Sequence, residues 1–243
     1  LIATGSWDHS AKIWDAATGK AVLKLDRAHT GYINSVEFSP DGRELLTASD
    51  DNTARLWDVA TGKPIGKALE GHTARLLSAT ITSPDAKRIL PVRGDKTARI
   101  WDRASGESER ELKGHLWPVL CGQFSADGER VITGSQDKLA IIWNAETGDP
   151  IIKLEGHTAA ITSVAISPDG TRALTGSQDN TAKLWDAKTG KEILSLPGHT
   201  QEITSVSFSP DGRNVLTSSR DGTAIIWLAS DWREPKVAAA QQQ

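Results

Sequence analysis

The chain has 243 residues, of which 24% are charged, and its 28 basic and 31 acidic side chains give a net charge of −3. This length and composition fit one large folded β domain or two small ones, exclude a chain disordered by composition, and lack the runs of Lys or Arg typical of nucleic-acid binders. The single cysteine, Cys121, excludes an internal disulfide, and no apolar stretch is long enough to span a bilayer.

A sequence motif of 15 residues recurs along the chain. It reads GSWDHSAKIWDAATG at residues 5–19, ASDDNTARLWDVATG at 48–62 and GSQDNTAKLWDAKTG at 176–190. Its tryptophan returns every 42 to 44 residues, at Trp14, Trp57, Trp101, Trp143, Trp185 and Trp227. The histidine of a separate Gly-His pair returns every 42 or 43 residues, at His29, His72, His115, His157 and His199. Two landmarks with one period predict a solenoid, a propeller or an array.

Each period is predicted to contain four β-strands. In the copy at 159–196, β-branched and alternating segments are separated by the turn sequences PDG, QDN and AKTG. No segment has apolar residues at helical spacing. The expected strands lie within residues 159–167, 171–177, 181–186 and 191–196. Short turns between successive strands predict an antiparallel meander.

Gly-His followed by Trp-Asp, repeated five or six times, makes the chain resemble the WD-repeat β-propeller family, over residues 1–227 and on to about Ala238. The resemblance implies an all-β fold, a β-propeller whose four-stranded antiparallel blades surround a central channel. Six WD motifs would supply about five complete blades and three strands of another, as part of a six- or seven-bladed ring. We expect a single domain over 1–238, N-terminally incomplete, and a tail or linker at 239–243.

Several copies depart from the common pattern. The first begins at its second strand, so residues 1–25 should form three strands. In the third copy, Pro91 and Arg93 replace Thr and Ser, which predicts a missing hydroxyl and weakened strand pairing. The last copy leaves a poor fourth strand at about 233–238. Complete blades are expected at 32–69, 74–112, 117–154, 159–196 and 201–238. Because the sequence lacks methionine and starts inside a pattern, we interpret it as part of a longer protein.

An aspartate lies six residues before every repeat tryptophan, at Asp8, Asp51, Asp95, Asp137, Asp179 and Asp221. Six carboxylates could indicate catalysis or metal binding, but one per blade lies too far from the next to converge on one site. Aspartate also fixes turns by accepting backbone N–H bonds, and we favour that structural role.

The resemblance further implies a hydrogen-bonded network in each blade. Its members are the Gly-His histidine, a Ser or Thr of the second strand, the turn aspartate and the tryptophan. Carried over to this chain, the network residues are His29, Ser49, Asp51, Trp57, His115, Ser135, Asp137, Trp143, His157, Ser177, Asp179, Trp185, His199, Ser219, Asp221 and Trp227.

The remaining residues do not favour an enzyme. Five of the six histidines belong to the Gly-His pairs, so only His9 is left for a general base or a zinc ligand. Cys121 lies in a predicted strand and is expected to be a small buried apolar residue. We predict no catalytic residues, no metal and no cofactor.

The resemblance places partner binding on one rim, formed by the third and fifth residues after each Gly-His histidine and by the residue before each turn aspartate. The candidates are Trp7, Tyr32, Asn34, Asp50, Arg75, Leu77, Leu120, Gln136, Thr162, Gln178, Glu202, Thr204 and Arg220, with Gly94, Pro118 and Ala160 also at rim positions. Of nine tryptophans, three are not repeat markers: Trp7, Trp117 and Trp232. Tryptophan, tyrosine and arginine are favoured interface anchors.

The short loops and mixed rim therefore predict a non-catalytic scaffold that binds proteins or peptides, without a membrane role. A propeller enzyme and a reader of histones or nucleic acid stay open as alternatives, the latter disfavoured by the mixed charge of the rim. The regular SPDGR and ATGK turns resemble bacterial tandem WD-repeat arrays, so a sensor or recognition module of a larger signalling protein is a further interpretation. The single cysteine and the resemblance imply a cytoplasmic location, although an upstream targeting signal stays open. The oligomeric state is left undetermined.

Overall fold

The structure is a computed structural model that describes residues 1–26, 28–39, 41–69, 76–80, 83, 85, 87–93 and 96–228, with the backbone alone at 76–80 and 93. These residues form 22 strands and no helix that could cross a membrane. In chain order the strands are β1 (Ile2–Gly5), β2 (Ala11–Trp14), β3 (Ala21–Leu25), β4 (Ile33–Phe38), β5 (Glu44–Ser49), β6 (Ala54–Asp58), β7 (Pro64–Leu69), β8 (Leu76–Thr80), β9 (Arg88–Arg93), β10 (Thr97–Asp102), β11 (Ser108–Lys113), β12 (Val119–Phe124), β13 (Arg130–Ser135), β14 (Ala140–Asn144), β15 (Pro150–Leu154), β16 (Ile161–Ile166), β17 (Arg172–Ser177), β18 (Ala182–Asp186), β19 (Glu192–Leu196), β20 (Ile203–Phe208), β21 (Val215–Ser219) and β22 (Ala224–Trp227).

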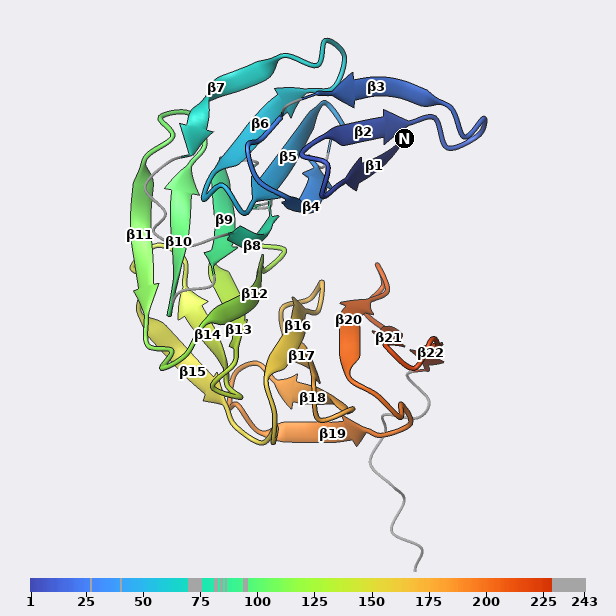
Figure 1. Cartoon of the computed structure of the whole chain (residues 1–243). Helices are drawn as coiled ribbons and strands as arrows, with labels where there is room; N and C mark the ends of the chain where they lie inside the picture. Colours follow the sequence, from blue (N-terminus) through green and yellow to red (C-terminus); the bar gives the residue numbers. More distant parts are fainter. Residues whose placement is uncertain are drawn as a thin grey trace, which may run out of the picture.

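The strands form six antiparallel sheets, each a meander of neighbours in the chain. The orders are β1-β2-β3, β4-β5-β6-β7, β8-β9-β10-β11, β12-β13-β14-β15, β16-β17-β18-β19 and β20-β21-β22. Figure 1 shows the sheets following an arc, with β4, β8, β12, β16 and β20 on the inner side and β7, β11, β15 and β19 on the outer side. The predicted all-β architecture of four-stranded blades is therefore confirmed.

The core lies between successive sheets, because each sheet buries one face against the next. One cluster joins Ile132 and Ala140 of the β12–β15 sheet to Ile161 and Val164 of the β16–β19 sheet. The sheets approach closely where the second strand carries a small residue. At Gly176 of β17, an added Cβ would lie 2.5 Å from Ile203 Cγ2 of the next sheet, so a larger residue there would require Ile203 to move.

The first sheet matches the expected partial blade, whereas the last sheet belongs to the copy expected to form a complete blade at 201–238. Residues 1–25 form three strands, as predicted, and Ile2 of β1 is exposed where the equivalent residues of β13 and β17 are buried. The last sheet also has three described strands, and its Leu216 and Ile226 are exposed. The fourth strand expected at about 233–238, Trp232 and the tail at 239–243 lie outside the described residues.

The third sheet along the chain, β8–β11, is irregular at Pro91. In the β16–β19 sheet, five consecutive residues of β17 pair with β18. Between β9 and β10, pairing occurs at Arg88, Ile89 and Val92, and the register includes no β10 partner for Leu90 or Pro91. Proline lacks the N–H that this ladder requires. Weakened pairing at this strand is confirmed for the described residues 88–93 and 97–102.

Candidate functional site

In four of the sheets, a four-membered network links the loop before the sheet to the strands behind it. In the β16–β19 sheet, His157 Nδ1 lies 2.7 Å from Asp179 Oδ2, and His157 Nε2 lies 2.7 Å from Thr175 Oγ1. Trp185 Nε1 donates to the same hydroxyl oxygen at 2.8 Å. The equivalent contacts occur in three other sheets, through the sets His29, Asp51, Thr47 and Trp57; His115, Asp137, Thr133 and Trp143; and His199, Asp221, Thr217 and Trp227.

The groups that can only donate or only accept determine the direction of each hydrogen bond in the network. The ionised Asp179 carboxylate can only accept, so His157 Nδ1 carries the ring proton and donates it to Asp179. In the neutral imidazole Nε2 then accepts from the Thr175 hydroxyl, whose oxygen accepts from the Trp185 indole N–H. The carboxylate also accepts from the backbone N–H groups of Thr158 and Thr181 and from the Thr181 hydroxyl. The aspartate is therefore fully used in holding two loops together.

The serines expected in the network occupy a different place, and this corrects the sequence-based assignment. Ser177 Oγ accepts from Asp179 N at 3.1 Å and donates to the carbonyl of Ala159 at 3.2 Å. It ends the strand, so its hydroxyl reaches the turn backbone, whereas Thr175 lies two residues deeper, next to both rings. The same correction applies to Ser49, Ser135 and Ser219. In the first sheet, Trp14 likewise donates to Thr4.

Burial sets the protonation state of the network. Desolvation lowers the pKa of His29, His115 and His157 below the ordinary value, although the neighbouring aspartate opposes that effect. Burial opposes ionisation of Asp179 too, but hydrogen bonds from Thr181, Thr158 and His157 outweigh it and lower the pKa of that carboxyl. A neutral imidazole beside an ionised carboxylate whose oxygens all accept hydrogen bonds favours a role in stabilising the fold over a role in catalysis.

These shifts predict acid destabilisation. Because the folded pKa of each histidine lies below its unfolded value of 6.5, the unfolded chain takes up protons first as the pH falls. Stability is complete above that pH and declines below it, by up to about 1.4 kcal/mol per pH unit for each histidine. The aspartates add a further loss below 3.8. Melting temperatures recorded from about pH 7.5 to about pH 5 should fall steadily; a flat profile would contradict this protonation state.

The rim is formed where the loop that follows each histidine meets the turn that contains the network aspartate. A backbone bond ties the residue before each turn aspartate to the third residue after the histidine: Asp50 to Tyr32, Gln136 to Pro118, Gln178 to Ala160 and Arg220 to Glu202. The structure therefore brings the two predicted sets of rim residues side by side in four sheets. Arg75, the Leu77 side chain and Gly94 lie outside the described residues.

Aromatic side chains cover the rim between the first two sheets. Trp7, in the turn between β1 and β2, is 73% exposed and stacks on Tyr32, which precedes β4 and is 46% exposed. Their ring centroids lie 5.4 Å apart with an interplanar angle of 18°. His9 meets Tyr32 edge-on at 5.7 Å. The outer face of the tryptophan ring remains available to a partner.

Polar rim candidates are largely paired with one another. Arg220 Nε lies 2.6 Å from Glu202 Oε1, and Asn34 Nδ2 donates to Asp50 Oδ1 at 2.7 Å. Thr204 contacts the Ser218 hydroxyl. Two candidates do not belong to the open rim: Thr162 donates to backbone carbonyls between two sheets, and Leu120 is half-buried in β12.

The positional rule missed two exposed residues. Leu116 and Trp117, directly after His115, are 69% and 61% exposed. They line an open pocket of about 540 Å³ with Gln136, Asp137, Lys138, Ala160 and Gln178. Trp117 is not one of the repeat tryptophans. This extra tryptophan was the sequence signal that could have placed the residue on the rim.

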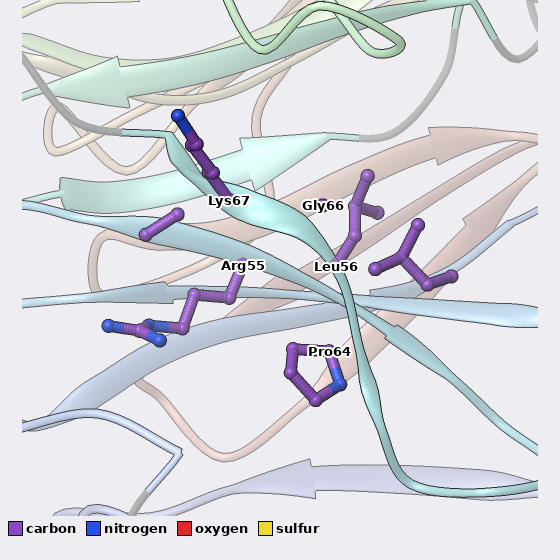
Figure 2. Close-up of a pocket in the computed structure, with 7 residues that line it drawn as sticks. Arg55, Leu56, Pro64, Gly66 and Lys67 are labelled. Carbon is purple, nitrogen blue, oxygen red and sulfur yellow. The ribbon is translucent and has the colours of Figure 1, made fainter.

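A second pocket lies on the outer strands, away from the rim. Figure 2 shows it beside Arg55 and Leu56 of β6 and Pro64, Gly66 and Lys67 of β7. The register between the two strands shifts here, and Gly66 has a φ of 67°. This pocket is therefore the product of a β-bulge in an outermost strand.

Groups that could carry chemistry are sparse in the described part of the chain. Burial raises the pKa of the Cys121 thiol to about 12, and the sulfur lies against the carbonyls of Gly134 and Ile161. At neutral pH this group is a thiol rather than a nucleophilic thiolate. Among the described side chains, no three His, Cys, Asp or Glu residues gather as a metal ion would require.

Meandering antiparallel sheets repeated at one period, four of which carry the His–Asp–Thr–Trp network, define a WD-repeat protein. The model of the family described as WD domain, G-beta repeat matches residues 1–15, 19–58, 106–144, 148–186 and 190–227, more than half of the chain. The chain belongs to this family. The irregular strand at Pro91 lies between the second and third matched segments.

Two curated relatives match over the length of about one repeat. Small ribosomal subunit protein RACK1y of Oryza sativa subsp. japonica is 49% identical over 41 residues, which are 17% of this chain and 12% of the relative. Ribosome assembly protein 4 of Chaetomium thermophilum is 46% identical over 44 residues, 18% of this chain and 8% of the relative. The matched part is thus a small share of either protein.

Proposed function

We propose that this chain is a non-catalytic scaffold that binds a protein or peptide partner through the rim. One observation carries the proposal. The residues behind the rim repeat from sheet to sheet, whereas the rim itself carries four large exposed side chains, Trp7, Tyr32, Leu116 and Trp117, on two separate parts of the arc. Exposed aromatic residues of this kind are frequent interface anchors.

Packing and recognition make opposite demands on a repeated structure. Each sheet must fit the next, so the same network recurs. A protein partner is not symmetric, so its contacts need different chemistry at each sheet. The aromatic pair at Trp7 and Tyr32, the ion pair of Glu202 and Arg220 and the pocket at Trp117 provide that difference. We further propose that the chain is the recognition module of a larger signalling protein and acts inside the cell.

The test is a peptide-display library selected on the whole chain, followed by calorimetry with the selected peptides. The triple variant Trp7→Ala, Tyr32→Ala, Trp117→Ala should change the free energy of unfolding by no more than about 0.5 kcal/mol, because these side chains are exposed. It should bind at least about thirtyfold more weakly, the equivalent of one anchor residue.

A matched control removes exposed apolar side chains from outer strands, through Val22→Ala, Ile151→Ala and Ile193→Ala. This control should bind with unaltered affinity. If the control loses binding while the rim variant retains it, the partner docks on the outer strands and the proposal is wrong.

A further inference from the structure

The same rim position is occupied differently at two places along the arc. It is formed by the residue before the turn aspartate of one sheet and the third residue after the histidine of the next. Between the first two sheets these residues are Trp7 and Tyr32, whose rings stack at 5.4 Å. Between the β12–β15 and β16–β19 sheets they are Gln136 and Ala160.

Alanine leaves open the place that the tyrosine ring takes. The buried Ala160 and the exposed Leu116 and Trp117 line the same pocket of about 540 Å³. Pockets that hold ligands commonly span about 300–1,000 Å³. The first pair of sheets thus shows, within the same chain, that an aromatic ring fits this position when a side chain supplies it.

The pocket is lined by two side chains of opposite charge, Asp137 and Lys138. The Asp137 carboxylate is already used by His115 Nδ1 and by the backbone N–H groups of Leu116 and Leu139. Lys138 is exposed and makes no ion pair with a described residue. The free charge offered to a ligand is therefore the ammonium group.

Lys138 occupies a left-handed turn position with a φ of 72°, and the equivalent residues of other sheets are His9, Asn52, Asn180 and Gly222. Asparagine and glycine adopt this conformation more readily than lysine does. In this sheet the position brings an ammonium group to the edge of the pocket.

We propose that this pocket binds a peptide segment of a partner protein that presents an aromatic side chain next to a carboxylate. The ring fills the space above Ala160 and packs on Trp117, and the carboxylate pairs with Lys138. The exposed carboxamides of Gln136 and Gln178 offer donors and acceptors to the peptide backbone. The inference rests on the proposed scaffold function and names the partner chemistry of one part of the rim.

The experiment uses the peptides selected on the whole chain and two tyrosine substitutions, one in the pocket and one outside it. Ala160→Tyr supplies the ring that Tyr32 supplies elsewhere, and should weaken binding at least about thirtyfold by filling the pocket. Ala17→Tyr, at an exposed alanine of the β2–β3 turn, is the matched control and should bind normally. Both should melt as the unsubstituted chain does.

Lys138→Asn tests the charge separately, and asparagine suits the left-handed backbone there. It should weaken an acidic peptide about three- to fivefold, as for an exposed ion pair. The same peptide with its Asp or Glu replaced by Asn or Gln should bind both chains equally.

Three results overturn the inference: selected peptides without an aromatic–acidic pair, full affinity in Ala160→Tyr, or equal loss in Lys138→Asn for acidic and amide peptides. If Ala160→Tyr binds normally while Trp7→Ala with Tyr32→Ala does not, this pocket is excluded and the scaffold function stands. If no rim substitution affects binding, both the inference about this pocket and the proposed binding through the rim are wrong.

Discussion

Replacing Asp179 with alanine is expected to reduce the free energy of unfolding by about 2–4 kcal/mol, as for breaking a buried network. The carboxylate accepts four bonds, from the ring of His157, the backbone of Thr158 and both the backbone and hydroxyl of Thr181. Its loss leaves a buried imidazole N–H unpaired and releases the loop from the turn. Denaturant unfolding followed by tryptophan fluorescence measures the change.

The matched control for that substitution is Asp186→Ala. Asp186 caps an exposed turn through Thr189, away from the network. Its removal should cost about 1 kcal/mol or less. Equal losses for the two variants would show that the network adds nothing beyond ordinary turn formation.

Replacing Thr175 with valine is expected to cost about 2–3 kcal/mol, because the shape is kept while one hydroxyl oxygen is removed. That oxygen accepts from the Trp185 indole and donates to His157 Nε2, so two buried polar groups lose their partner together. Thermal and denaturant unfolding report the loss.

Ser177→Ala distinguishes the two hydroxyls of this strand. Its side chain bonds to turn backbone at the end of β17, so its removal should cost about 1 kcal/mol. If Ser177→Ala were the more damaging of the two, the network hydroxyl would be the serine, and the role assigned to Thr175 would be wrong.

The fold could be predicted from the sequence because its signals repeat. The tryptophan and histidine landmarks, the PDG and Asp-Asn turns and the alternating strands all agree on one period, and the strand limits follow. Even the irregular strand could be expected, since Pro91 cannot donate to a ladder.

The roles of individual side chains were harder to predict from the sequence than the fold. Thr175 and Ser177 point to the same face of β17, and spacing alone does not tell which of them reaches the rings. The Trp117 pocket depends on the small size of Ala160 in the next sheet, a contact between residues more than 40 positions apart. Such contacts become visible only when neighbouring sheets are placed together.

The most direct test of rim recognition is an amide hydrogen-exchange footprint of the whole chain with a selected peptide bound. We expect slower exchange in the segments 5–9, 29–34, 115–120 and 134–139, which carry the rim residues. Exchange in β15 and β19 should not change, because these outer strands lie away from the rim. Protection confined to the outer strands, with the four rim segments unaffected, would contradict recognition by the rim.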